Sequence, residues 1–202
     1  MPPIKNIGIA LIVFSSFTIL LLLFHKNESF FNLRTVIKEH LGLFKHCKSQ
    51  YIIFYILPLF FAAGLALLYE GGERFYTELS VVMGIILSML FAILSILSGH
   101  DFSTVKDETQ QTMAKKVVKE TINAIIFDSM LCLFLLLYGL VMIVVEGISF
   151  TEVSLSPTVI AIATCILAGI SYYIFAVILL TLLLIIKQMS KLVEFNMNVK
   201  KK

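Results

Sequence analysis

The sequence of 202 residues contains no tryptophan, only three cysteines and few charged residues, 14% in all. An average soluble domain carries about 25% charged and about 45–50% apolar residues, whereas 59% of this chain is hydrophobic. A chain of this length cannot enclose so much apolar surface in a single soluble core. The composition therefore argues against a soluble globular protein. It also excludes intrinsic disorder, because disordered chains are poor in these same residues.

The sequence also lacks the short motifs of common enzymes. It contains no Walker loop, no G-x-S-x-G, no H-E-x-x-H and no paired acids at catalytic spacing. Three cysteines do not make a disulfide framework. His46 and Cys47 are adjacent, so on a helix they would point about 100° apart and would not easily share a metal ion. We therefore expect no enzymatic activity, no metal and no cofactor.

Apolar runs of bilayer length are the main feature that is present. A helix needs about 20 residues to cross about 30 Å of hydrocarbon, and these runs do not alternate as β-barrel strands do. The predicted spans are residues 7–24, 51–69, 79–98, 125–145 and 160–186. We therefore expect an all-α, polytopic integral membrane protein, in which residues 1–202 form one membrane domain with about five transmembrane helices.

The positive charges predict the orientation of these spans. Fourteen of the sixteen lysines and arginines lie after the first run, after the third run or in the C-terminal tail. Because positive residues stay cytoplasmic, we expect the N-terminus outside and the C-terminus inside. The first run could instead be a signal peptide, which would leave four spans. However, it lacks a strongly basic start and a small-x-small cleavage site.

Two segments between the predicted spans have helical patterns and lie on the cytoplasmic side. Residues 32–44 repeat apolar side chains at helical spacing, which is typical of an interfacial helix and also of a partner-binding helix. Residues 104–124 are polar on most sides, with Met113 and Val117 as a thin apolar line, and should continue into the fourth span as one helix. The candidate partner-binding residues on this segment are Lys106, Lys115, Lys116 and Lys119.

Small residues recur along one face of the third span. In lipid, small residues at this spacing let helices approach closely. The face can pack within one subunit, or it can form a subunit interface in a homo-oligomer. The residues of this small-residue stripe are Ser80, Gly84, Ser88, Ala92, Ser95 and Gly99.

Asp128 is the one acid inside a predicted span, about one turn from its inner end. An intramembrane acid is a functional candidate, for example as a proton relay or a pore-lining group. Alternatively, Asp128 lies at the membrane interface or bonds Ser129, Asn123 or a neighbouring helix. No second acid lies at depth, so the support for ion transport is weak.

The partners expected from charge are lipid and protein. The net charge of +3 comes from scattered basic residues interleaved with acids, which does not favour direct nucleic-acid binding. Basic residues of the tail can instead bind anionic lipid headgroups. The predicted outer loops are short, so a large protein partner should meet the cytoplasmic face.

Three stretches give the chain a resemblance to a known family: YIIFYILPLFFAAGLALLYE, ELSVVMGIILSMLFAILSILSG and VVKETINAIIFDSMLCLFLL. In the arrangement and residue pattern of their apolar runs they resemble the membrane subunit of the Kiwa anti-phage defence system, which is regarded as a four-span protein. The resemblance implies an oligomeric inner-membrane sensor and scaffold that recruits a cytoplasmic DNA-binding partner. It transfers no site residues. A membrane-disrupting, pore-forming effector and a small transporter remain alternative functions.

Overall fold

The computed structural model describes residues 33–42, 48–69, 72–99, 108–146 and 156–200, together with Gly8, Leu11, Phe14, Ser15 and Thr18. These residues contain no β-strand, which confirms the predicted all-α class. The elements are α2 (Leu33–Gly42), α3 (Lys48–Tyr51), a π-helical turn (Ile52–Ile56), α4 (Leu57–Leu68), α5 (Glu73–Ser98), α6 (Glu108–Glu146) and α7 (Pro157–Lys200).

Four of the described helical segments are long and apolar enough to cross a membrane: Ser49–Leu68, Glu73–Ser98, Gln111–Val144 and Ala161–Phe195. They correspond to the second, third, fourth and fifth predicted spans. The first predicted span, residues 7–24, lies outside the described residues except at five positions. The fold is thus that of a polytopic α-helical membrane protein.

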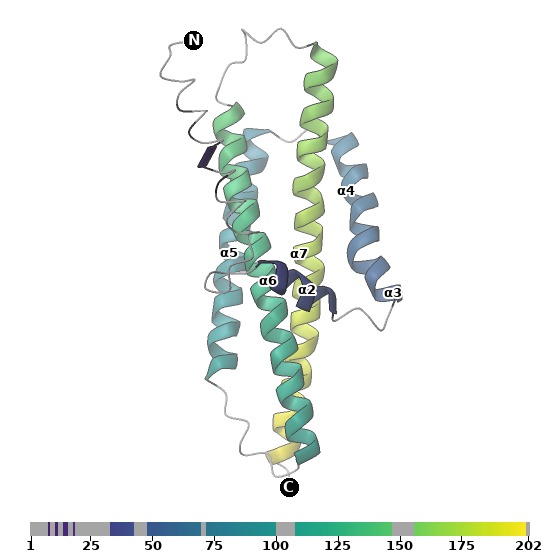
Figure 1. Cartoon of the computed structure of the whole chain (residues 1–202), viewed down its shortest axis with the longest axis vertical. Helices are drawn as coiled ribbons and strands as arrows, with labels where there is room; N and C mark the ends of the chain where they lie inside the picture. Colours follow the sequence, from purple (N-terminus) through teal and green to yellow (C-terminus); the bar gives the residue numbers. More distant parts are fainter. Residues whose placement is uncertain are drawn as a thin grey trace.

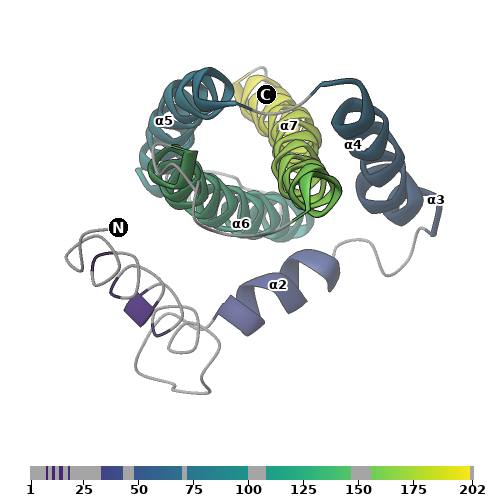
Figure 2. The same ribbon diagram turned by 90° about the horizontal axis from the view of Figure 1, so that it is seen from above.

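Three long helices, α5, α6 and α7, lie around a common core, and α4 lies against the outer side of α7 (Figures 1 and 2). The core combines apolar side chains from all three helices, among them Met83, Leu90, Ile125, Leu135 and Ile178. A smaller cluster joins α4 to α7 through Ala62, Ala66, Ala168 and Tyr172. Small side chains at this second contact allow the two helices to approach closely.

The segment from α3 to α4 accommodates a proline inside a membrane-spanning helix. Pro58 has no backbone N–H, and its ring would clash with the carbonyl of Phe54 in a regular α-helix. The turn just before it is widened, so that the Leu57 N–H donates to the Ile52 carbonyl five residues back. Pro58 is therefore accompanied by a local π turn.

Helices α6 and α7 are much longer than the bilayer requires. They contain 39 and 44 residues, against 26 in α5. At about 1.5 Å per residue, α6 is about 58 Å long and α7 about 66 Å. The prediction of one continuous helix through residues 104–145 is confirmed over the described part, 108–146. The fifth predicted span ended at residue 186, but α7 continues as a helix to Lys200.

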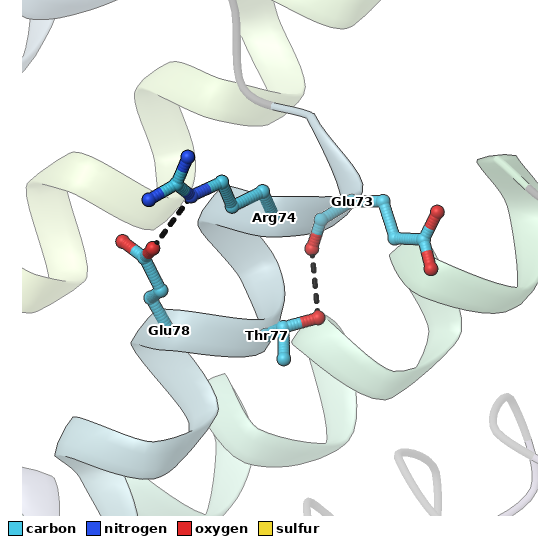
Figure 3. Close-up of polar contacts among 4 residues, drawn as sticks. All are labelled: Glu73, Arg74, Thr77 and Glu78. Atoms are coloured by element: carbon cyan, nitrogen blue, oxygen red, sulfur yellow. Dashed lines mark hydrogen bonds and ion pairs between the residues drawn. The ribbon is translucent and has the colours of Figure 1, made fainter.

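At its start, α5 carries a local charge pair (Figure 3). Arg74 Nε donates to Glu78 Oε1 at 2.8 Å, and the Thr77 hydroxyl donates to the Glu73 carbonyl at 2.9 Å. Arg74 is one of two basic residues outside the three basic segments of the sequence. With Glu73 and Glu78 beside it, this end of α5 has a net negative charge.

Candidate functional site

The carboxyl group of Asp128 is fully buried in the bundle. Neither of its oxygens has a hydrogen-bond partner within the described residues. Ile125 and Cys132, one turn before and one turn after it on α6, belong to the main hydrophobic core. Burying a polar group without a hydrogen bond costs free energy. In a membrane protein, such a group indicates a functional position.

Two observations do not fit a purely structural role for Asp128. No bond joins it to Ser129 or Asn123, and it has no solvent exposure. It follows the exposed Lys119 by nine residues, about 13 Å along the helix. Asp128 also lies at the level of α2, since His40 of α2 stacks on the adjacent Phe127, so an interfacial α2 would place Asp128 close to the membrane interface.

Helix α2 packs across α6 beside this position. The fully buried ring of His40 stacks on Phe127, with ring centroids 3.9 Å apart and planes inclined by 8°. Burial lowers the pKa of His40 from 6.5 to about 4, because desolvation penalises the charged imidazole. Figures 1 and 2 show α2 crosswise to the spans. This is the orientation of an interfacial helix, one of the two interpretations of residues 32–44.

The described lysines among the proposed partner-binding residues lie on α6 at and beyond the level where α5 ends, because Gly139 of α6 lies opposite Ser80 of α5 and α5 ends 18 residues later. The side chains of Lys115, Lys116 and Lys119 are exposed. Lys106 lies outside the described residues. In Figure 1, α6 and α7 both continue beyond the end of α5 toward the C-terminus. The two extensions form what we call the inner hairpin, residues 108–120 of α6 and 187–200 of α7.

Residues 104–124, expected to be polar on most sides with a thin apolar line of Met113 and Val117, pack against α7 in their described part. Ala114 and Thr121 on α6 are buried, as are Gln188 and Leu192 on α7. Val117 packs against the main core cluster, to which Leu192 belongs, but Met113 is 55% exposed. The C-terminal part of α7 therefore covers one side of the α6 extension.

The small-residue stripe of α5 does not coincide with the buried face of this helix. The buried face carries larger side chains, including Leu79, Met83 and Leu90. Ser80 is half-buried near Gly139 of α6, where an added Cβ would lie 3.0 Å from Ser80 Oγ. At Gly84 an added Cβ would meet no atom within 4 Å. The residues of the stripe that are exposed are Ser88, Ala92, Ser95 and Gly99.

Three features of the structure were not predicted from the sequence. The stacking of His40 on Phe127 joins residues 87 positions apart and has no local signal. Tyr138 donates its hydroxyl hydrogen to the Leu167 carbonyl at 2.9 Å and so fixes the register of α6 and α7. The helical tail of α7 had a detectable signal, because Ile185, Gln188 and Leu192 are spaced by three and four residues.

The described helices define a polytopic α-helical membrane protein with a helical extension on one side. Comparison with protein-family models, with curated proteins and with solved structures gave no match.

Proposed function

We propose that the chain is the inner-membrane sensor and scaffold subunit of a bacterial anti-phage defence complex, and that it recruits a cytoplasmic protein partner. It needs no cofactor and does not itself contact nucleic acid. The resemblance to the Kiwa membrane subunit supports the defence role. The observation that carries the scaffold role is the inner hairpin, because α6 and α7 continue as a pair well past the end of α5.

The inner hairpin has the properties of a protein-binding projection. It is held by its own buried contacts, so its surface is pre-formed. Lys115, Lys116 and Lys119 are exposed on it, and Lys187 and Lys191 of α7 add to its positive charge. Complementary charge on a partner would increase the association rate and the specificity of binding.

Charge also supports the proposed orientation. The end of the bundle that carries the inner hairpin is rich in lysine, whereas the opposite end of α5 carries Glu73 and Glu78 with Arg74 paired to Glu78. Positive residues stay cytoplasmic, so this arrangement favours a cytoplasmic hairpin and C-terminus. It also favours an outer position for the start of α5.

We also propose that the chain forms a homo-oligomer through the exposed part of the small-residue stripe on α5. Ser88, Ala92, Ser95 and Gly99 are exposed within one subunit, so this part of the stripe remains available to a second copy. Membrane helices associate through such surfaces, because small side chains allow close backbone contact.

The scaffold role predicts that Lys115, Lys116 and Lys119 hold the partner. We expect simultaneous substitution of the three by glutamate to lower co-purification of the partner at least tenfold from source cells, because the contact charges are reversed. Phage plating on the same cells should show loss of defence. The control is the substitution Thr158→Glu, which adds one acid to an exposed position near the start of α7, outside the inner hairpin.

Correct insertion of the triple variant is verified first, because these lysines also contribute to topology. A correctly inserted triple variant that keeps its partner and its defence activity would exclude the inner hairpin as the recruiting surface. The next surface to test would then be α2.

A small transporter is a second candidate function, favoured by one observation. Asp128 is a fully buried acid within a membrane bundle, the type of residue that binds protons or ions in transporters. The two functions differ in a membrane-potential assay. A transporter or a pore-forming effector changes the membrane potential when the protein is active. If the protein is a transporter, Asp128→Asn should abolish this change. A scaffold leaves the potential unchanged.

A further inference from the structure

The inner hairpin exposes apolar side chains at a level where α5 no longer accompanies it. Met113 of α6 is 55% exposed and Val193 of α7 is 52% exposed. Each lies four residues from a partly buried neighbour, Val117 on α6 and Met189 on α7, both of which pack against the core cluster. Residues four apart share one face of a helix, so each pair continues the apolar packing of its helix toward the end of the inner hairpin.

The register of α6 and α7 brings the two pairs to the same level. Tyr138 of α6 contacts Leu167 of α7 through a hydrogen bond of 2.9 Å. The helices are antiparallel, and both rise about 1.5 Å per residue. Moving 25 residues from that bond toward the hairpin end reaches Met113 on α6 and Leu192, next to Val193, on α7. We call Met113, Val117, Met189 and Val193 the hairpin patch.

The charges around the hairpin patch are mainly positive. Its exposed basic neighbours are Lys115, Lys116, Lys119, Lys187 and Lys191. The acids in the same stretches with described side chains are Glu120, which is half-buried, and Glu194, which is exposed. An apolar centre with a basic rim is complementary to a partner with an apolar centre and an acidic rim.

We propose that the hairpin patch binds one amphipathic helix of the cytoplasmic partner, with acidic residues flanking the apolar face of that helix. The proposal deepens the proposed function and rests on it. Two helices with apolar residues at spacing four offer the surface that a third helix fills by helix-in-groove recognition. In the bundle, α5 packs on α6, shares a core cluster with side chains of α7, and ends at Ser98.

The test uses the full chain in nanodiscs of phosphatidylcholine. The probe is a fluorescein-labelled amphipathic peptide of about five helical turns, with leucine on one face and glutamate elsewhere. The comparison peptide has lysine in place of every glutamate. Fluorescence anisotropy should show saturable binding of the acidic peptide, at least tenfold tighter than that of the basic peptide, and no binding to empty nanodiscs.

Two variants and a matched control locate the binding surface. Val193→Glu and the double variant Met113→Gln with Val193→Gln should each weaken binding of the acidic peptide at least tenfold. Thr158→Glu adds the same charge at an exposed position near the start of α7, outside the inner hairpin, and it should change binding less than twofold. All the altered side chains are exposed, so folding should be preserved, as verified by the thermal unfolding midpoint.

Four results would overturn the proposal. The first is an equal effect of Val193→Glu and Thr158→Glu, and the second is equal binding of the two peptides. The third is displacement of the acidic peptide by phosphatidylglycerol vesicles, and the fourth is a dimer that Val193→Glu converts to a monomer. The third result would assign the patch to lipid and the fourth to a second copy. If lysine reversal releases the partner while the peptide experiments fail, recruitment by the hairpin stands and only the helix-binding patch is excluded.

Discussion

At Asp128 a carboxyl group is fully buried without a hydrogen-bond partner in the described part of the chain. Leaving a buried polar group unsatisfied costs about 1–3 kcal/mol, so Asp128→Val should raise the free energy of unfolding by about 1 kcal/mol. Thermal unfolding in detergent measures the change. Asp128→Asn keeps a polar group in place and should not stabilise. A clear loss of stability in Asp128→Val would instead mean that the carboxyl group has a partner outside the described residues.

Two glycines on neighbouring helices allow a matched comparison. An added Cβ at Gly139 would lie 3.0 Å from Ser80 Oγ and 3.6 Å from the Tyr76 carbonyl, whereas at Gly84 it would meet nothing within 4 Å. Gly139→Leu should therefore separate α5 from α6 and lower the free energy of unfolding by about 1–3 kcal/mol. Gly84→Leu should fold normally. A wild-type unfolding midpoint for Gly139→Leu would contradict the close approach of these helices.

Gly84→Leu also tests the small-residue stripe at the level of assembly. Because the monomer has room for the larger side chain, smaller particles in detergent would show that the stripe joins subunits. Particles of unchanged size would exclude a subunit interface at Gly84.

At the scale of elements, α2 should dock on α6 in a pH-dependent way. The pKa of His40 falls from 6.5 to about 4 on burial, so the docked state holds the neutral ring. The free energy that favours docking of α2 is largest above pH 6.5. It decreases as the pH falls toward 4, by about 3 kcal/mol in total. The chain has no tryptophan, so a single tryptophan introduced at Leu41 reports the change by its emission.

His40→Phe is the control for this titration. Phenylalanine keeps the stacking on Phe127 but does not bind a proton, so the emission of the reporter should not change over the same pH range. An equal pH response in both variants would show that another group controls the position of α2.

At the scale of the whole molecule, the charge distribution predicts one orientation. A reporter enzyme that is active only in the periplasm should be inactive when fused at the C-terminus and active when fused near Gly72, just before α5. The physical reason is the retention of lysine-rich segments in the cytoplasm. The reverse pattern would invert the bundle and place the inner hairpin outside the cell.

The sequence by itself determined the fold class, because runs of about 20 apolar residues have few other stable structures than membrane-spanning helices. It also predicted the single long helix of α6, since no proline interrupts residues 108–146. The tertiary structure decided which faces are buried. Small residues marked one face of α5, but the face that packs carries Leu79, Met83 and Leu90, because the large side chains fill the space between three helices.

The position of Asp128 and the pairing in the inner hairpin were also decided by the tertiary structure. Hydropathy placed Asp128 one turn from the inner end of its span, and only the packing of the helices shows that its side chain has no solvent exposure. The docking of His40 on Phe127 and the bond from Tyr138 to Leu167 join distant segments. Such contacts depend on helix register, and periodicity within one segment contains no information about the register of another.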